Sequence, residues 1–181
     1  ENIVLGGKGR AYGIEMSAHK NNGLLTGWIS YTLSWSENKI DGINNNKWYT
    51  ANNDRRHDIN LVLMRQLSEA WNISTSFVFT SGQALTAPSA KYQIDGNTVY
   101  YYAERNGYRA PSSHHLDVCA TYTKQLKHCE RQWSFGIYNI YNRENPYVIT
   151  FSEDDASVSG TKATQTALFG ILPFISFTLR F

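Results

Sequence analysis

The chain has 181 residues, a formal net charge of +2 and an aromatic content of 14%, including 12 tyrosines and 5 tryptophans. This length is enough for one domain with a hydrophobic core. The nearly balanced charge gives no reason to expect a nucleic-acid or anionic-lipid partner. No run of about 18 apolar residues is present, so a transmembrane helix is excluded. A membrane-spanning strand is not excluded, because only every second residue of such a strand faces lipid.

Apolar and polar residues alternate along most of the chain, which predicts strands with one apolar and one polar face. Near the start, Tyr12 and Ile14 share one face and Glu15 and Ser17 share the other. The predicted strands are 9–20, 24–35, 54–67, 71–81, 112–124, 132–142 with a continuation allowed to 151, and about 164–181. Most are about 10–14 residues long, against a usual ~5–6 in globular proteins. A tilted membrane-spanning strand needs ~9–11 residues.

The predicted connections alternate between short and long. Short polar turns fall at 21–23, 68–70 and 125–131, whereas long polar loops fall at 36–53, 82–110 and about 152–160. Outer-membrane barrels have short periplasmic turns and long extracellular loops. Counting back from a periplasmic C-terminus places every long loop outside the cell.

The last strand ends on an aromatic residue. Its apolar face carries Ile175, Phe177, Leu179 and the terminal Phe181. A chain with such an ending resembles a bacterial outer-membrane protein, in which a C-terminal strand with a final Phe resembles the signal read by the barrel-assembly machinery.

These features predict an all-β fold, a transmembrane antiparallel β-barrel segment of about seven long strands. Bacterial single-chain barrels have even strand numbers, and an open sheet edge cannot face lipid. Seven strands are odd, so we expect residues 1–181 to be the last part of a larger barrel.

Several motifs are similar to the C-terminal barrel of TonB-dependent receptors of Bacteroidota. They are GKGRAYGIE (7–15), LTGWISYTLSWS (25–36), DRRHDINL (54–61), RNGYRAP (105–111), YNIYNRENPY (138–147) and LFGILPFISFTLRF (168–181). The resemblance implies the last third of a 22-stranded outer-membrane barrel that imports a scarce nutrient with energy from TonB. The implied partners are the remaining barrel and plug of the same receptor, TonB through that plug, the barrel-assembly machinery, outer-membrane lipid and a surface lipoprotein.

The chain also departs from that family. Neither a plug domain nor a TonB-box segment is expected within it, and its ending is unlike that of starch-utilisation receptors. The segment Ser113-His114-His115-Leu116-Asp117 stands where relatives have Tyr-His-Arg-Leu-Asp. No ligand site is therefore carried over from the family.

Two groups of residues are candidates for ligand binding in the extracellular loops. Arg55 and Arg56 form a basic cluster that could attract an anion, or could pair with Asp54, Asp58 and neighbouring strands. The other group combines aromatic side chains with an arginine, as recognition surfaces often do, or packs on adjacent loops. This second group is Tyr100, Tyr101, Tyr102, Tyr108 and Arg109.

No metal, cofactor or catalytic role is predicted. The adjacent His114 and His115 point to opposite faces of one strand and cannot grip one ion. Structural roles are favoured for them and for His19, His57 and His128. The run Glu153-Asp154-Asp155 could bind calcium with loop carbonyls, but a solvated acidic tip is favoured.

The cysteines and lumen-facing carboxylates are given structural interpretations. Cys119, facing the lumen in mid-strand, and Cys129, in the following turn, are too far apart to be bridged along one strand. Glu15, Asp58 and Asp117 are expected to satisfy basic groups of a plug or of opposing strands rather than to act as acid and base. No nucleophile elbow, phosphate loop or zinc motif is present, so we expect no enzyme.

Two alternatives remain open from the sequence. One is a porin-like or adhesin-like outer-membrane barrel without energised transport, which an upstream plug would exclude. The other is a soluble β-sandwich with the apolar face as its internal core. The residues do not name the ligand, and siderophore, cobalamin, haem, peptide and glycan all stay open.

Overall fold

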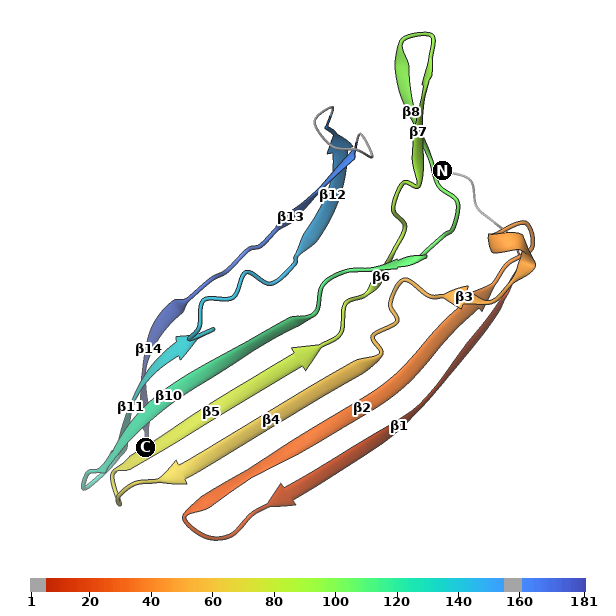
Figure 1. Ribbon diagram of the computed structural model, residues 1–181. Coiled ribbons are helices and arrows are strands. Elements are labelled where there is room, and N and C mark those ends of the chain that lie inside the picture. Colours follow the sequence, from red (N-terminus) through yellow and green to blue (C-terminus); the bar gives the residue numbers. More distant parts are fainter. Residues whose placement is uncertain (1–5, 155–160) are drawn as a thin grey trace.

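The computed structural model describes residues 6–154 and 161–181, and its main feature is one large antiparallel sheet (Figure 1). Seven long strands follow one another across it in sequence order, so each pairs with its neighbour in the chain. They are β1 (Lys8–Lys20), β2 (Leu25–Lys39), β4 (His57–Gln66), β5 (Trp71–Thr80), β10 (Ser113–Gln125), β11 (Glu130–Tyr138) and β14 (Leu172–Arg180). Strands β1 and β14 form the two edges.

The strand register gathers the apolar residues on one face of the sheet. Ala18, Ile29 and Leu61 lie in one cross-strand row, which continues through Phe77 to Leu116. The opposite face carries rows made of residues such as Glu15, Thr32, Asp58, Thr80 and Ser113. The predicted alternation therefore holds in these rows from β1 to β10, because side chains of successive residues point to opposite faces.

The connections alternate as predicted, and all the long ones lie at one end of the sheet (Figure 1). Short turns at 21–24, 67–70 and 126–129 lie at the other end, where the C-terminus also lies. The long loops contain the 3-10 helix η1 (Asn44–Asn46) and small strands. These strands are β3 (Tyr49–Thr50), β6 (Ala84–Leu85), β7 (Ala90–Ile94), β8 (Asn97–Tyr101), β9 (Tyr108–Arg109), β12 (Val148–Glu153) and β13 (Thr161–Thr166).

The last two predicted strands have different bounds in the structure. Strand β11 ends at Tyr138, and Val148–Glu153 does not continue it. That segment instead pairs with Thr161–Thr166 in a separate hairpin, so the last sheet strand begins only at Leu172. The prediction failed because this hairpin shows the same alternation as a sheet strand. Pro173 is tolerated because it lies at the start of its strand.

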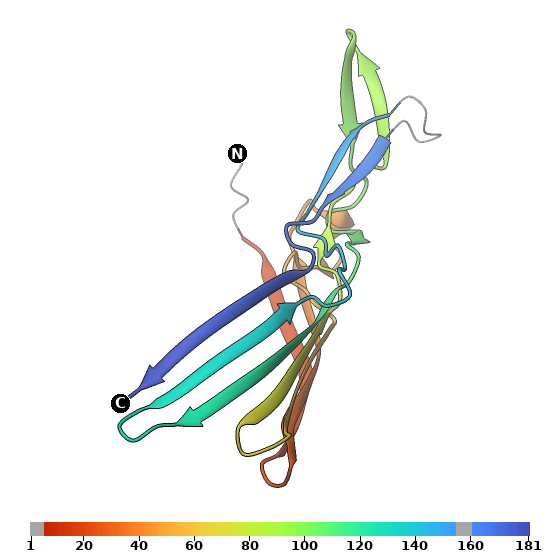
Figure 2. The same ribbon diagram turned by 90° about the vertical axis from the view of Figure 1, so that its left-hand side faces the viewer.

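The few buried side chains of the described residues lie at the loop end, not on the sheet. They are Tyr49, Asp54, Ala51, Ala84, Ala87 and Asn139. The long strands form a single layer, and the described residues place no second sheet against the apolar face (Figure 2). On that face Ile14 is 59% exposed and Ile175 is 62% exposed. A β-sandwich core is therefore not present within the described part of the chain.

Within residues 6–154 and 161–181, no helix is both long enough and apolar enough to cross a membrane.

Candidate functional site

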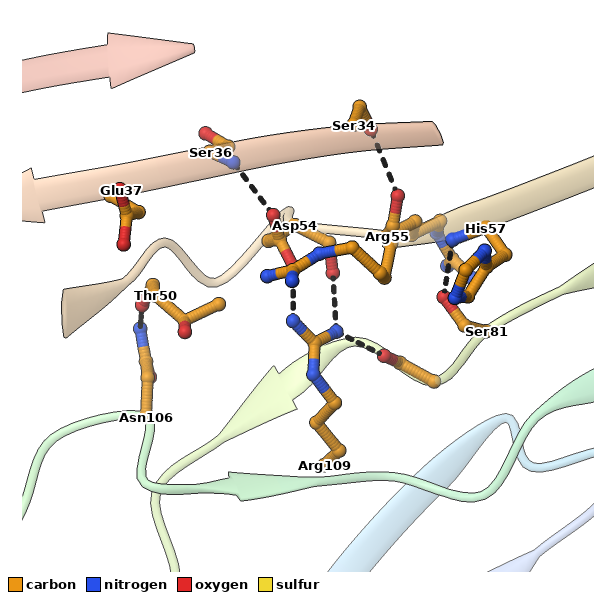
Figure 3. Close-up of polar contacts among 12 residues, drawn as sticks. Ser34, Ser36, Glu37, Thr50, Asp54, Arg55, His57, Ser81, Asn106 and Arg109 are labelled. Carbon is orange, nitrogen blue, oxygen red and sulfur yellow. Dashed lines mark hydrogen bonds and ion pairs between the residues drawn. The ribbon is translucent and has the colours of Figure 1, made fainter. Parts of the chain in front are cut away.

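The loop between β2 and β4 meets the loop between β5 and β10 around the carboxylate of Asp54 (Figure 3). This aspartate is only 1% exposed. Its Oδ1 accepts a hydrogen bond from the Ser36 backbone N–H at 2.6 Å, which ties the end of the first loop to β2. Its Oδ2 binds the guanidinium of Arg109, which belongs to the second loop. Asp54 thus holds together strand β2, its own loop between β2 and β4, and the loop between β5 and β10.

Arg109 is held in place by a hydrogen bond to the backbone as well as by its ion pair with Asp54. Its Nη1 also donates to the carbonyl oxygen of Gly82 at 3.0 Å, which closes the base of its own loop. The Asp54 carboxylate lies 3.7 Å from a second guanidinium, that of Arg56. A carboxylate removed from water in this way requires such partners, because an unpaired buried charge is costly.

Two further contacts fasten the same pair of loops. Asn106 Nδ2 donates to the Thr50 carbonyl at 2.9 Å (Figure 3). The Asn44 side chain accepts from the Arg105 N–H at 2.8 Å and donates to the carbonyl of the same residue at 2.9 Å. The loops between β2 and β4 and between β5 and β10 therefore form one body.

A cleft of about 470 Å³ lies between this body and the β12–β13 hairpin. Most of its walls are apolar, and polar atoms come from Ser89, Tyr108, Arg109, Thr161 and Gln165. Arg109 is the one charged residue among the described residues that line the cleft, and Asp54 balances that charge. The apolar lining comes from Leu85, Ala87, Pro88, Ala90, Pro111, Ile149, Phe151 and Ala163. Such a lining suits an uncharged, partly apolar ligand.

The β12–β13 side of the cleft is positioned by a buried turn after β11. Asn139 is fully buried, and its backbone N–H donates to Asp117 Oδ1 at 2.9 Å. Its side chain donates to the Arg143 carbonyl at 2.8 Å and accepts from the Arg143 N–H at 3.0 Å. Its φ of +53° is the left-handed conformation that asparagine tolerates better than most residues. This turn directs the chain away from the sheet and into the hairpin.

The predicted binding residues do not converge on one site. Tyr108 and Arg109 line the cleft, and Arg55 lines a smaller adjoining hollow of about 180 Å³. Tyr102 lines a separate hollow beside Ile43 and Arg105. The remaining three residues lie elsewhere: Tyr100 and Tyr101 on the β7–β8 hairpin, and Arg56 against Asp54 and over the Trp35 ring at 4.8 Å.

Sequence reasoning missed the hairpin half of the cleft. Ile149 and Phe151 from β12 and Ala163 and Gln165 from β13 line it. The available signal was the cluster of asparagines and a proline at 139–146, which interrupts the alternation and marks a turn.

The four histidines outside the β10–β11 turn make pairwise contacts. His57 Nδ1 lies 2.9 Å from the Tyr31 hydroxyl, and His115 lies 3.6 Å from the Asp117 carboxylate. His114 Nδ1 lies 2.7 Å from the Tyr141 hydroxyl, and the fourth, His19, packs against Trp28. Burial raises the pKa of the Tyr141 phenol, which Arg143 opposes and Asp117 reinforces.

Within the described residues, no three His, Cys, Asp or Glu side chains converge on a metal-sized site. Cys119 and Cys129 are both free thiols, as predicted. Cys119 shares the polar face with Thr121, whose Oγ1 lies 3.9 Å from its Sγ. Of the predicted acidic tip, Glu153 ends β12, and Asp155 lies outside the described residues.

No protein-family model, no curated protein and no solved structure matches this chain.

Proposed function

We propose that this chain forms part of the wall of an outer-membrane β-barrel, in a TonB-dependent transporter that takes up a scarce nutrient. The observation that carries the proposal is an exposed apolar face that runs across all seven long strands and is bounded at both ends by aromatic rings. In water such a face would be a large exposed hydrophobic patch. In a membrane it is the surface that lipid requires.

Pairs of aromatic rings lie near both ends of this face. Near the loop end, Tyr12 stacks on Trp35 with ring centroids 5.4 Å apart. Near the turn end, Trp71 lies 5.1 Å from Tyr122 by the same measure. On β5 the aromatic rings of this face extend from Phe79 to Trp71, which are about 26 Å apart along a strand at ~3.3 Å per residue. A tilt of about 40° reduces this to about 20 Å, comparable to the ~25 Å apolar band of outer-membrane barrels.

The two free edges of the sheet are a second argument for the proposal, because they favour a closed barrel that further strands complete. Strands β1 and β14 are edges and are not paired with each other. Their outer backbone groups would be unsatisfied in hydrocarbon, where each costs several kcal/mol. A larger barrel would pair them.

The cleft between Tyr108 and the β12–β13 hairpin is the proposed contribution of this chain to ligand capture. Its balanced charge and largely apolar lining favour a neutral, partly apolar nutrient over an anionic one. Arg55 and Arg56 then serve to fix the loops: Arg55 Nη1 donates to Thr80 Oγ1 at 3.3 Å, and Arg56 pairs with Asp54.

The test compares nutrient depletion by source cells that carry the protein and by cells in which it is deleted. Spent media are profiled by mass spectrometry, with and without a protonophore. A compound that only the wild type removes, and only without the protonophore, is the expected result. Removal that the protonophore leaves unchanged would favour the porin-like alternative, and identical profiles would contradict transport altogether.

A further inference from the structure

We propose that the turn end of the apolar face binds one anionic phospholipid, with its phosphate between Lys124 and Arg131 and an acyl chain in the aromatic groove beside them. The inference rests on the proposed membrane wall and adds a specific lipid site to it. Three independent observations carry it: a pair of like charges, an unpartnered guanidinium nitrogen and an apolar groove.

Lys124 and Arg131 lie directly opposite each other on β10 and β11. Like charges in this position are destabilising unless an anion lies between them. No described residue forms an ion pair with either side chain. The nearby acid Glu130 points to the other face and is engaged by Arg180 at 3.2 Å. Glu69, in the adjoining turn, forms no ion pair within the described chain.

The Nε of Arg131 is shielded from solvent and has no hydrogen-bond partner, as is also the case for the Nε atoms of Arg56 and Arg143. A buried donor without a partner is costly, and a charged one more so. A phosphate oxygen is a suitable acceptor, because guanidinium groups bind phosphates with short, charge-assisted hydrogen bonds.

The groove begins immediately beside the two cations. Tyr122 and Trp133 lie two residues from Lys124 and Arg131 on their strands, so all four side chains share the apolar face. Tyr122 and Trp133, together with Trp71, Phe135 and Ile175, line an open groove of about 390 Å³ that has no polar lining. A cation pair next to a wholly apolar groove matches an anionic headgroup joined to an acyl chain. The net charge of +2 is a sum over the whole chain and does not reveal this local pair of positive charges.

A second pair of like charges on the same face provides the matched control. Lys8 and Lys39 are directly opposite each other at the loop end. They adjoin the Arg10–Glu37 ion pair, 2.6 Å long, and line none of the hollows described above. Neutralising them removes the same charge without touching the groove.

The experiment uses the full protein purified from its membrane, reconstituted in phosphatidylcholine vesicles and titrated with phosphatidylglycerol carrying brominated acyl chains. Trp35, on the same face at the loop end, is replaced by phenylalanine in every sample, so that quenching of tryptophan fluorescence reports lipid at the groove, where Trp71 and Trp133 lie. The variants are Lys124→Gln with Arg131→Gln, the charge-preserving exchange Lys124→Arg with Arg131→Lys, and the control Lys8→Gln with Lys39→Gln.

Each cation is expected to contribute about fivefold in affinity for an anionic lipid, so the double neutral variant should bind about 25-fold more weakly. The charge-preserving exchange and the Lys8 and Lys39 control should bind as the wild type does. Equal binding by the neutral variant, or an equal loss in the control, would overturn the lipid site. Flotation of the same samples separates the two proposals, because a protein that does not float with vesicles would contradict the membrane wall itself.

Discussion

The Asp54 carboxylate, 1% exposed, lies against the Arg109 guanidinium from a loop that is remote in sequence. This ion pair joins the loop after β2 to the loop after β5, and Arg109 also lines the cleft. One wall of the proposed ligand site therefore depends on an aspartate that does not itself line that site.

Replacing Asp54 with asparagine should loosen these loops without unfolding the sheet. The change leaves Arg109 and Arg56 without their acidic partner. Breaking a buried ion pair costs about 3–5 kcal/mol, and we expect about 2–3 kcal/mol here because the Arg109 side chain remains 36% exposed and screened by water. Hydrogen exchange at residues 82–110 is the measurement. The matched change Asp41→Asn, at an exposed loop position, should leave exchange unaltered, and equal exchange in both variants would contradict the role of Asp54.

The turn at Asn139 should respond differently to alanine and to glycine. Both changes remove the two side-chain hydrogen bonds to the Arg143 backbone, each worth about 1 kcal/mol. Only alanine also strains the backbone at a φ of +53°, for about 1–2 kcal/mol more. Local opening free energies at 139–146, measured by hydrogen exchange, should rank wild type above Asn139→Gly above Asn139→Ala. Equal values for the two variants would show that the left-handed conformation contributes nothing to the free energy of local opening.

Filling the cleft should weaken nutrient uptake. Ala163 lines the cleft opposite Phe151 on the paired strand, whereas its neighbour Thr164 does not line it. We expect Ala163→Phe to raise the half-saturating concentration of the transported compound about tenfold, equivalent to about 1.4 kcal/mol of lost binding. Thr164→Phe is the control of equal size. Unchanged uptake kinetics in Ala163→Phe would show that the cleft does not take part in ligand capture.

The sheet was predictable because the alternation that defines each strand involves residues that are close together in the chain. Residues such as Tyr12, Ile14 and Met16 alternate with small or polar neighbours, and the two-residue period fixes which face each one takes. The short turns carry their own signals, such as Asn21-Asn22-Gly23, with Gly23 at a φ of +100°.

The site was not predictable in the same way. The contact between Asp54 and Arg109 joins residues far apart in the chain, and no periodicity encodes it. The alternation in Val148–Glu153 is equally compatible with a continued sheet strand and with a separate hairpin. The outcome depends on the turn at Asn139, a buried residue whose backbone N–H donates to Asp117 of β10 and whose side chain bonds to the Arg143 backbone in the loop.

Spin labels at two adjacent residues of β5 show whether the apolar face of the sheet lies against lipid. After Cys119 and Cys129 are replaced by serine, single cysteines are introduced at Phe77, on the apolar face, or at Ser76, on the polar face. In membranes, the label at position 77 should collide readily with oxygen, which concentrates in lipid, and poorly with a water-soluble nickel chelate. The label at position 76 should show lower access to oxygen. Low access to both probes at position 77, or access to the nickel chelate that exceeds access to oxygen, would contradict a lipid-facing wall.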